Sequence, residues 1–508
     1  MEKSRGVQYT YGYYNAMNIN HASFTLANQG IKPPKIKTAC ELGFGQGLSL
    51  VINSAASNSA WFGSDIEPSQ VAFARSLSSH YQDRCKIYNE PFAHFGNNPS
   101  LEQFDFICLH GVWTWIGDDD RKIICDFLAK KLKPGGLLYI SYNTLPSWVN
   151  FLPLQKLMAA FAENNKVVTS SHEANLSESF RFTERLLATN PAFLKVNPSV
   201  VNSMEKLKNQ KANYLIHEYL AADFTPMTFD EMAHWLAPIN MDYVCSSNVV
   251  DDAHNLHLTK EHLEFLSEIK NSVFQETCKD LMVNKQFRTD YWIKGAESLS
   301  KTGRKRELDK FSLILTRHSE DVELKFNGAL GKAEGDEPIY RPLLNLLSNH
   351  EAKGYRDVIN EMIGQGIEEA KAEEAVKMLF GLGCLAPFVN EDVSKTVQED
   401  VKKLNEKIME RSINDELHID YLGSSIIGGA FRLPKIDQMH IRSMRSGQKT
   451  QEELTDSAWR TMKMLGRRAI KESKTLETEK ENLDYLKEHS QTFLTKSAPI
   501  LRALGILE

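Results

Sequence analysis

The chain has 508 residues, 42% of them hydrophobic and 25% charged, which is typical of a globular protein with sizeable cores. Its formal net charge of −6 excludes a strongly basic surface, so we expect no nucleic-acid partner. The start lacks the apolar core of a signal peptide, no apolar run is long enough for membrane insertion, and the seven cysteines show no C-x-x-C spacing, which together predict a cytoplasmic protein with reduced thiols and no metal site.

The first part of the chain predicts repeated β-α units. Short apolar runs predict strands at 35–43, 60–65, 85–89, 104–111 and 136–142. Amphipathic stretches between them predict helices at 48–57, 68–81 and 118–132. The last of these begins with aspartates and ends with lysines, which suits the helix dipole. Nearly continuous apolar strands that alternate with helices predict an α/β fold, with a parallel sheet covered on both faces.

After the fifth strand the pattern changes. Residues 151–225 predict a helical insertion for substrate or dimer contacts. Residues 226–319 predict a regulatory region that completes the sheet through the stretches MDYVCSS and FRTDYWIKG. Residues 320–400 resemble a winged-helix module in outline. We favour packing or protein binding over DNA binding there, because 337–390 holds five Lys and Arg against eight Asp and Glu. Residues 401–508 predict a charged, helical C-terminal domain.

The stretch ELGFGQGLSL joins the first strand to its helix and holds Gly43, Gly45 and Gly47. A dinucleotide-binding G-x-G-x-x-G loop would need its third glycine where Leu48 stands. A P-loop would need G-K-[ST], and no lysine follows Gly47. The remaining pattern, E-x-G-x-G-x-G, places the carboxylate of Glu41 near the strand end, followed by glycines where the backbone can approach a ligand.

This pattern resembles motif I of the class I S-adenosylmethionine-dependent methyltransferases. The resemblance implies a Rossmann-like sheet within 1–150 that binds S-adenosylmethionine, with Glu41 near the cationic end of the cofactor and the glycines beside its amino-acid and ribose portions. The stretches FDFICLHGVWTWIGDDDR, KPGGLLYISYNTLPSW and LIHEYL narrow the resemblance to methyltransferases with a methyltransferase regulatory domain. The best-defined members of this family are dimeric bacterial lysine methyltransferases that act on outer-membrane proteins. They imply a lysine-bearing protein substrate, such as an outer-membrane or surface protein, and a homodimer.

Side chains after the next three strands complete the expected cofactor site. Asp65 ends the second strand and is expected to accept hydrogen bonds from the ribose hydroxyls; the alternative is that it caps the following helix. Ile66, the next residue, is also expected to contact the cofactor. Glu90 and Phe92 follow the third strand, near the expected adenine. His110 ends the fourth strand, where a base, a cofactor contact and a structural histidine are all compatible with the sequence.

Methyl transfer needs an unprotonated nucleophile, and a lysine amine with an ordinary pKa of about 10.4 loses its proton more readily in a desolvating aromatic channel. Aromatic residues gather near the expected site. Tyr13 and Tyr14 precede the first strand. Trp113 follows the fourth strand, and Tyr142 ends the fifth. We predict that Tyr13, Trp113, Tyr142 and His110 form the catalytic set.

Trp115 and Trp148 are expected to serve packing. For His217 and Glu218 we favour helix packing, and the alternative is that they face the methyl acceptor. The fourth strand ends in LHGVW and lacks the N/D-P-P-Y loop of many base methyltransferases, which disfavours DNA methylation. We therefore predict a methyltransferase for protein lysines. The alternatives are a methyltransferase for a small molecule or cell-surface saccharide, and a cofactor-binding scaffold without turnover.

Overall fold

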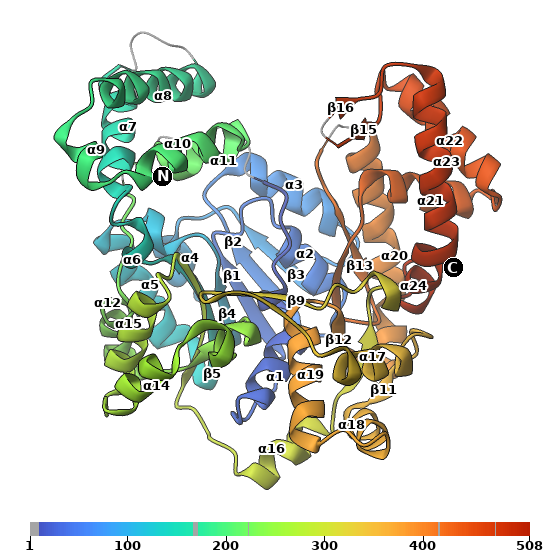
Figure 1. Cartoon of the computed structure of the whole chain (residues 1–508), viewed down its shortest axis with the longest axis horizontal. Helices are drawn as coiled ribbons and strands as arrows, with labels where there is room; N and C mark the ends of the chain where they lie inside the picture. Colours follow the sequence, from blue (N-terminus) through green and yellow to red (C-terminus); the bar gives the residue numbers. More distant parts are fainter. Residues whose placement is uncertain (1–9, 166–170, 222, 415–416, 473) are drawn as a thin grey trace.

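The computed structural model describes residues 10–165, 171–221, 223–414, 417–472 and 474–508. A seven-stranded sheet lies at its centre, in the order β3-β2-β1-β4-β5-β7-β6 (Figure 1). The strands are β1 Thr38–Leu42, β2 Ala60–Ser64, β3 Cys85–Tyr88, β4 Phe104–Leu109, β5 Leu132–Asn143, β6 Met241–Ser246 and β7 Phe287–Lys294. Strands β1 to β5 are parallel, whereas β7 is antiparallel to both of its neighbours. The predicted Rossmann-like α/β fold is confirmed, and β6 and β7 come from MDYVCSS and FRTDYWIKG.

Helices cover both faces of this sheet. They are α1 Ile19–Asn28, α2 Leu48–Ala55, α3 Pro68–Ser78, α4 Phe92–Gly96, α5 Asp118–Lys131 and α12 Phe229–Leu236. Neighbouring strand residues alternate between two cores: Ala39 packs in the cluster that contains α2 and α3, and Cys40 packs with α4, α5 and α12. Because both faces are buried, the strands have the continuous apolar sequences that predicted them.

A helical insertion stands between β5 and β6, at the upper left of Figure 1. It consists of α6 Leu145–Trp148, α7 Leu152–Asn164, α8 His172–Ala188, α9 Ala192–Val196, α10 Ser199–Lys208 and α11 Ala212–Tyr219. Trp148, Met158 and Met204 belong to a core of its own. Its two ends meet where the Leu145 N–H donates to the Met227 carbonyl at 3.0 Å. The insertion therefore has a core of its own, and its two ends leave and rejoin the sheet at neighbouring positions.

After α12 come α13 His254–His257, α14 Lys260–Ser267, α15 Ser272–Met282 and α16 Lys301–Leu308, and then a small module. The module contains β8 Ser312–Leu315, β9 Lys325–Gly328, β10 Gly331–Glu334, α17 Glu337–Leu346, β11 Lys353–Gly354, α18 Tyr355–Gly364, α19 Glu369–Gly381 and β12 Leu385–Pro387. The winged-helix prediction is not confirmed. Strand β12 pairs with β8, which precedes the three helices, whereas a wing would be a hairpin that follows them.

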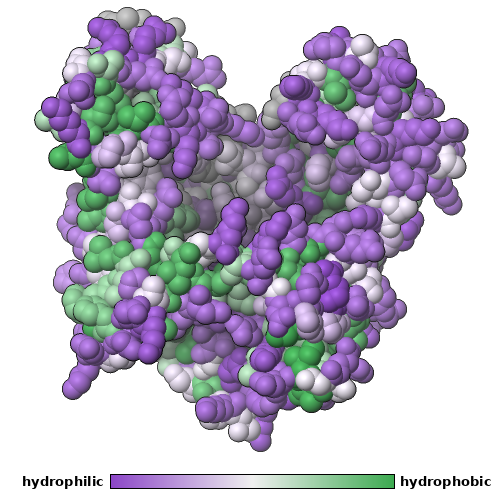
Figure 2. Space-filling model, in the orientation of Figure 1, coloured by the Kyte–Doolittle hydropathy of each residue, from purple (hydrophilic) through white to green (hydrophobic). Residues whose placement is uncertain are grey.

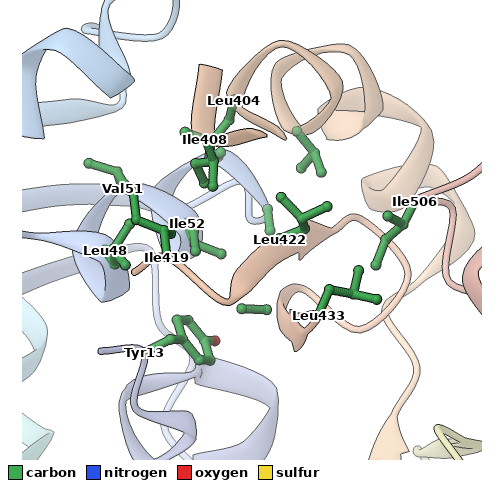
Figure 3. Close-up of a cluster of buried hydrophobic side chains, with 14 of the residues drawn as sticks. Tyr13, Leu48, Val51, Ile52, Leu404, Ile408, Ile419, Leu422, Leu433 and Ile506 are labelled. Atoms are coloured by element: carbon green, nitrogen blue, oxygen red, sulfur yellow. The ribbon is translucent and has the colours of Figure 1, made fainter. Parts of the chain in front are cut away.

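The C-terminal region is mostly helical, as predicted. It comprises α20 Glu391–Asn414, β13 Tyr421–Ser424, β14 Gly429–Arg432, α21 Lys435–Arg445, α22 Gln451–Met464, β15 Ile470–Lys471, β16 Lys474–Thr475, α23 Glu479–Thr492 and α24 Ala498–Ala503. It packs directly on the central sheet's helix α2, where Leu404 and Ile408 share a core with Val51 and Ile52 (Figure 3). None of the helices that the structure describes combines the length and the apolar character of a membrane span. Figure 2 shows a hollow in the surface between the insertion and this region.

Candidate functional site

A cavity of about 780 Å³ lies at the carboxyl ends of β1, β2 and β4. Its volume is in the range of small-molecule and cofactor sites. All of the residues predicted to bind the cofactor line it: Glu41, Gly43, Gly45, Gly47, Asp65, Ile66, Glu90, Phe92 and His110. They come from four separate βα turns, which the parallel sheet brings to one edge. Their contact with the cofactor itself stays a prediction.

The glycine loop between β1 and α2 has left-handed backbone at Gly43, Gly45 and Gly47, with φ of +68°, +58° and +73°. A Cβ on Gly43 would lie 2.7 Å from Val112 Cγ2, and a Cβ on Gly47 would lie 2.8 Å from Ala74 Cβ. A Cβ on Gly45 would meet no described atom within 4 Å. The outer glycines therefore permit close packing of the loop, while Gly45 leaves bare backbone at the cavity for a ligand to approach.

Two carboxylates meet behind this loop. Glu41 is 4% exposed, and its Oε2 has no hydrogen-bond partner among the described residues. Burial, and secondly the charge of Asp65, raise the pKa of Glu41 to about 8. Asp65 accepts hydrogen bonds from the Gly45 and Glu67 N–H groups, both at 2.9 Å, and burial raises its pKa to about 6. A buried carboxylate oxygen that lacks a partner suits a cationic ligand group, so the donor set fits the expected cofactor.

Asp65 is not the cap of the helix that follows it. The N-cap of α3 is Glu67, whose side chain accepts a hydrogen bond from the Ser69 N–H at 3.4 Å. Asp65 instead ties the end of β2 to the glycine loop through Gly45. Each carboxylate oxygen has further acceptor capacity, so these bonds leave room for ribose hydroxyls.

His110 is held between two tyrosine rings. Its Nδ1 lies 2.7 Å from the Tyr139 hydroxyl, and the Tyr14 ring stacks on it with centroids 3.5 Å apart. Burial lowers the pKa of His110 to about 3, so the imidazole is neutral near pH 7 and is a poor base there. This disfavours the role of base among the three that the sequence left open, and a cofactor contact and a structural role both fit the position of His110. Within the described ranges, no group of His, Cys, Asp and Glu side chains is placed to hold a metal ion.

The other three aromatics of the predicted catalytic set are not brought to the cavity. Tyr13 donates its hydroxyl to Asn53 Oδ1 on α2 at 2.8 Å. Trp113 is fully buried and donates its Nε1–H to a methionine sulfur at 3.3 Å. Tyr142 donates to Asp290 Oδ2 at 3.1 Å. Each side chain points into a core on one side of the sheet, so the structure gives all three a packing role.

The helical insertion supplies the other half of the cavity, which agrees with the substrate contacts expected of residues 151–225, although the sequence did not single out most of its lining residues. Its lining residues on α7, α8 and α11 include Ala159, Glu163, His172, Asn175, Ile216, His217 and Glu218. Trp115 also lines the cavity, and its ring packs 4.6 Å from Phe224. The stretch LIHEYL carried the signal for His217 and Glu218, but a helix sequence does not show which of its faces meets a cavity.

The lining of this cavity is acidic. Besides Glu41, Glu67, Asp65 and Glu90, the lining carboxylates are Asp120 on α5 and Glu163, Glu218 and Asp223 in the insertion, and none of the described lining residues is Lys or Arg. Burial raises the pKa of Tyr14 to about 12, and the charges of Glu41 and Glu218 add to this effect. The carboxylate of Glu218 therefore lies near the ring that covers His110. Such a lining attracts cations and disfavours anionic ligands.

Two segments of the chain match known protein families. Residues 40–140 match a family described as a methyltransferase domain, and residues 211–294 match one described as a predicted methyltransferase regulatory domain. The first match spans β1 to β5 with the glycine loop, and the second spans α11 to β7. The cavity is thus lined by residues from both matched segments.

Similar proteins and a similar solved structure cover larger parts of the chain. An uncharacterized protein of Synechocystis sp., sll1526, is 29% identical over 506 residues, which is 98% of each chain. An uncharacterized protein of Rickettsia prowazekii, RP789, is 24% identical and covers 59% of this chain and 54% of its own. Among solved structures, PKMT2 from Rickettsia typhi in complex with AdoHcy has a TM-score of 0.67 at 15% identity, over 96% of this chain and 98% of that one. This likeness shows that the two chains share a fold.

Proposed function

We propose, from the premise that this chain is a class I S-adenosylmethionine-dependent methyltransferase with a methyltransferase regulatory domain, that it methylates lysine side chains of a protein substrate. The observation that carries the choice of lysine is the acidic lining of the insertion half of the cavity, which we call the acceptor half: Glu163, Glu218 and Asp223 line it, and the charge of Asp223 also acts on Lys156, which lies outside the lining. An ammonium group is attracted to this lining, whereas a phosphorylated or carboxylated acceptor is repelled. The name of PKMT2, a protein lysine methyltransferase of the same fold, also supports the proposal.

S-adenosylmethionine supplies the activated methyl group of the reaction. The chain's own residues bind and orient it. Glu41 would hold the cationic end, the backbone at Gly45 would allow close approach, and Asp65 would accept hydrogen bonds from the ribose hydroxyls. Phe92 and Glu90 would border the adenine. Binding and alignment account for most of what the protein must contribute to a transfer of this kind.

The acceptor amine must lose its proton before it attacks. Burial between Tyr14 and Trp115 removes water and favours the neutral amine, while Glu218 attracts the ammonium form to the cavity. His110 is a poor base near pH 7, so in this scheme the proton leaves to water as the side chain enters. The aromatic faces then stabilise the methylated ammonium product by cation–π contact.

A labelling experiment tests this function. The enzyme is incubated with methyl-labelled cofactor and a lysate separated into protein and small-molecule fractions. We expect label in the protein fraction that appears as methyl-lysine after hydrolysis. Label confined to small molecules or saccharides would contradict the lysine proposal, and cofactor binding with no label in any fraction would favour a scaffold.

Two variants separate the two halves of the cavity. Asp65→Ala should abolish the rise in melting temperature that saturating S-adenosylmethionine gives to the wild type, because it removes the ribose acceptor and the tie to Gly45. Glu218→Gln should keep that rise and lose about tenfold in methyl transfer, because only the acceptor half changes. Equal loss of both properties in Glu218→Gln would place this residue with the cofactor.

The proposal includes a cytoplasmic setting, an outer-membrane or surface protein as the lysine-bearing substrate, and a homodimer. The setting is supported by the cysteines, since all seven are free thiols and six of them are buried. Free thiols are the rule in a reducing compartment. The homodimer rests on the sequence resemblance alone.

A further inference from the structure

Residues 10–18, which we call the N-terminal strap, run between the cavity and the C-terminal region. Thr10, Gly12 and Tyr14 line the cavity, whereas Tyr13 and Asn18 are buried. The backbone at Tyr14 is extended, with φ −118° and ψ 107°. In extended backbone neighbouring side chains point to opposite sides, which fits Tyr14 at the cavity and Tyr13 in the core; a short 3-10 helix, Asn15–Met17, then leads to Asn18.

On the cavity side, the strap forms part of the cofactor half. The Tyr14 ring stacks on His110 with centroids 3.5 Å apart, and the Tyr14 N–H donates to Ser49 Oγ on α2 at 3.0 Å. The charge of Glu41 contributes to the raised pKa of Tyr14, which places this ring close to the cofactor-binding carboxylate. Any displacement of Tyr14 would therefore change the shape of the cofactor half.

On the opposite side, the strap is held by the hairpin of β13 and β14. Asn18 Nδ2 donates to the Gly428 carbonyl at 2.6 Å, across a separation of 410 residues. The Tyr13 ring lies 6.0 Å from that of Tyr421. A Cβ on Gly429 would come within 2.4 Å of Asn18 Nδ2 and 2.5 Å of the Tyr13 hydroxyl. The start of β14 therefore approaches the strap so closely that a side chain at position 429 would displace the Asn18 amide and the Tyr13 hydroxyl.

We propose that the β13–β14 hairpin of the C-terminal region sets the affinity for the cofactor, by holding the N-terminal strap against the cavity through Tyr13 and Asn18. These two are positioning residues, since they act through Tyr14 and do not line the cavity. Because the strap contacts both the hairpin and the cofactor half of the cavity, movement of the C-terminal region is coupled to cofactor binding. By linkage, cofactor binding must stabilise the hairpin contact to the same extent.

The sharpest variant is Asn18→Ser. Asn18 also caps α1, since its Oδ1 accepts from the Asn20 and His21 N–H groups at 2.8 and 2.9 Å. Serine retains the capping function but has no side-chain amide to reach Gly428. We expect Asn18→Ser to weaken binding of S-adenosylhomocysteine to the full chain by about three- to tenfold in titration calorimetry, which corresponds to one net hydrogen bond. Gly429→Ala, which pushes on both positioning residues, should act in the same direction.

A matched control removes effects of general destabilisation. Met462→Ala opens a cavity in the C-terminal helices, away from the strap, and should lower the melting temperature while leaving the affinity for S-adenosylhomocysteine within twofold of wild type. Hydrogen exchange gives a second readout. S-adenosylhomocysteine should slow exchange in residues 421–432 of the wild type and should do so less in Asn18→Ser. Wild-type affinity in both Asn18→Ser and Gly429→Ala, or weakened binding in Met462→Ala alone, would overturn the proposal.

Discussion

At the scale of one residue, Glu41 couples the cofactor site to pH. It ends β1, is almost fully buried, and has a pKa raised from 4.5 to about 8, mainly by burial. In the folded protein without ligand it is therefore mostly protonated near pH 7. Because the folded-state pKa is the higher one, its contribution to stability is present below pH 4.5 and is lost as the pH rises to about 8. A cationic ligand favours the ionised form and reverses this loss.

We predict that cofactor affinity depends on pH through this residue. Below about pH 8, binding must expel the proton of Glu41, so affinity should rise from pH 6 to pH 8, by at most tenfold per pH unit, and then level off. Titration calorimetry in buffers of different ionisation enthalpy would measure both the affinity and the proton released. Glu41→Gln has no proton to lose, and it should bind more weakly at pH 8 with little proton release. Identical pH profiles for the two proteins would contradict the prediction.

At the scale of an element, β7 brings a buried arginine into the second half of the sheet. Arg288 forms ion pairs with Asp280 at 2.7 Å, Asp290 at 2.8 Å and Glu276 at 3.1 Å, and its guanidinium lies 4.2 Å from the centre of the Phe229 ring. The opposing register of β5 places Tyr142 beside this group. The cluster thus joins β5, β7, α12 and α15, and it explains why Tyr142 serves packing and not the cavity.

Removal of the arginine should be costly, because it leaves buried carboxylates without their cation. We expect Arg288→Met to lower the free energy of unfolding by about 3–5 kcal/mol in urea denaturation. Arg341→Met is the matched control: Arg341 is paired with Glu337 at 2.9 Å on an exposed helix face, and its loss should cost less than about 1 kcal/mol. Similar small losses for both variants would show that the buried carboxylates become protonated or hydrated without penalty.

At the scale of the whole molecule, the C-terminal region and the methyltransferase sheet share one core. Every residue of α2 is buried, because the sheet covers one side and α20 with the β13–β14 hairpin covers the other. Leu404, Ile408 and Leu422 pack in the same cluster as Val51 and Ile52 (Figure 3). The insertion differs, since its core around Met158 is a separate cluster.

This arrangement predicts which parts unfold together. Ile408→Ala should cost about 2–5 kcal/mol and should lower the same calorimetric transition that S-adenosylhomocysteine raises, because α2 belongs to both regions. Met158→Ala, at an equally buried position, should affect a transition of the insertion and leave the ligand-sensitive one nearly unchanged. If Ile408→Ala left the ligand-sensitive transition in place, the shared core would not be a cooperative unit.

Local patterns were enough to predict the central sheet and the loop that ends β1. Strands buried on both faces have distinctive apolar runs, and Gly43, Gly45 and Gly47 follow one of them at a spacing that excludes other nucleotide loops. Since parallel strands end at one edge, Asp65 and His110 could be expected beside that loop. These inferences need only the order of the strands.

Side-chain direction and long-range contacts could not be predicted in the same way. Tyr13 and Tyr14 are adjacent and chemically alike, yet only Tyr14 faces the cavity, because the hairpin near Gly428 takes the other side of the strap. Trp113 and Trp115 are likewise close in sequence and chemically alike, yet only Trp115 lines the cavity. The shape of the acceptor half depends on the orientation of the insertion relative to the sheet. The hydrophobic periodicity of its helices does not determine that orientation.

The shared core of α2 has a consequence for synthesis of the chain. About 350 residues separate Ile52 from Leu404. At translation rates of about 5–20 residues per second, α20 is therefore synthesised about 20–70 s after α2, whose second side it covers. During this interval the growing chain exposes an apolar helix face on an incomplete domain. We expect nascent chains that end before α20 to be bound by chaperones and to aggregate when released, whereas chains extended past β14 should not. We therefore expect the strap beside the cofactor pocket to reach its final position only after the β13–β14 hairpin has left the ribosome.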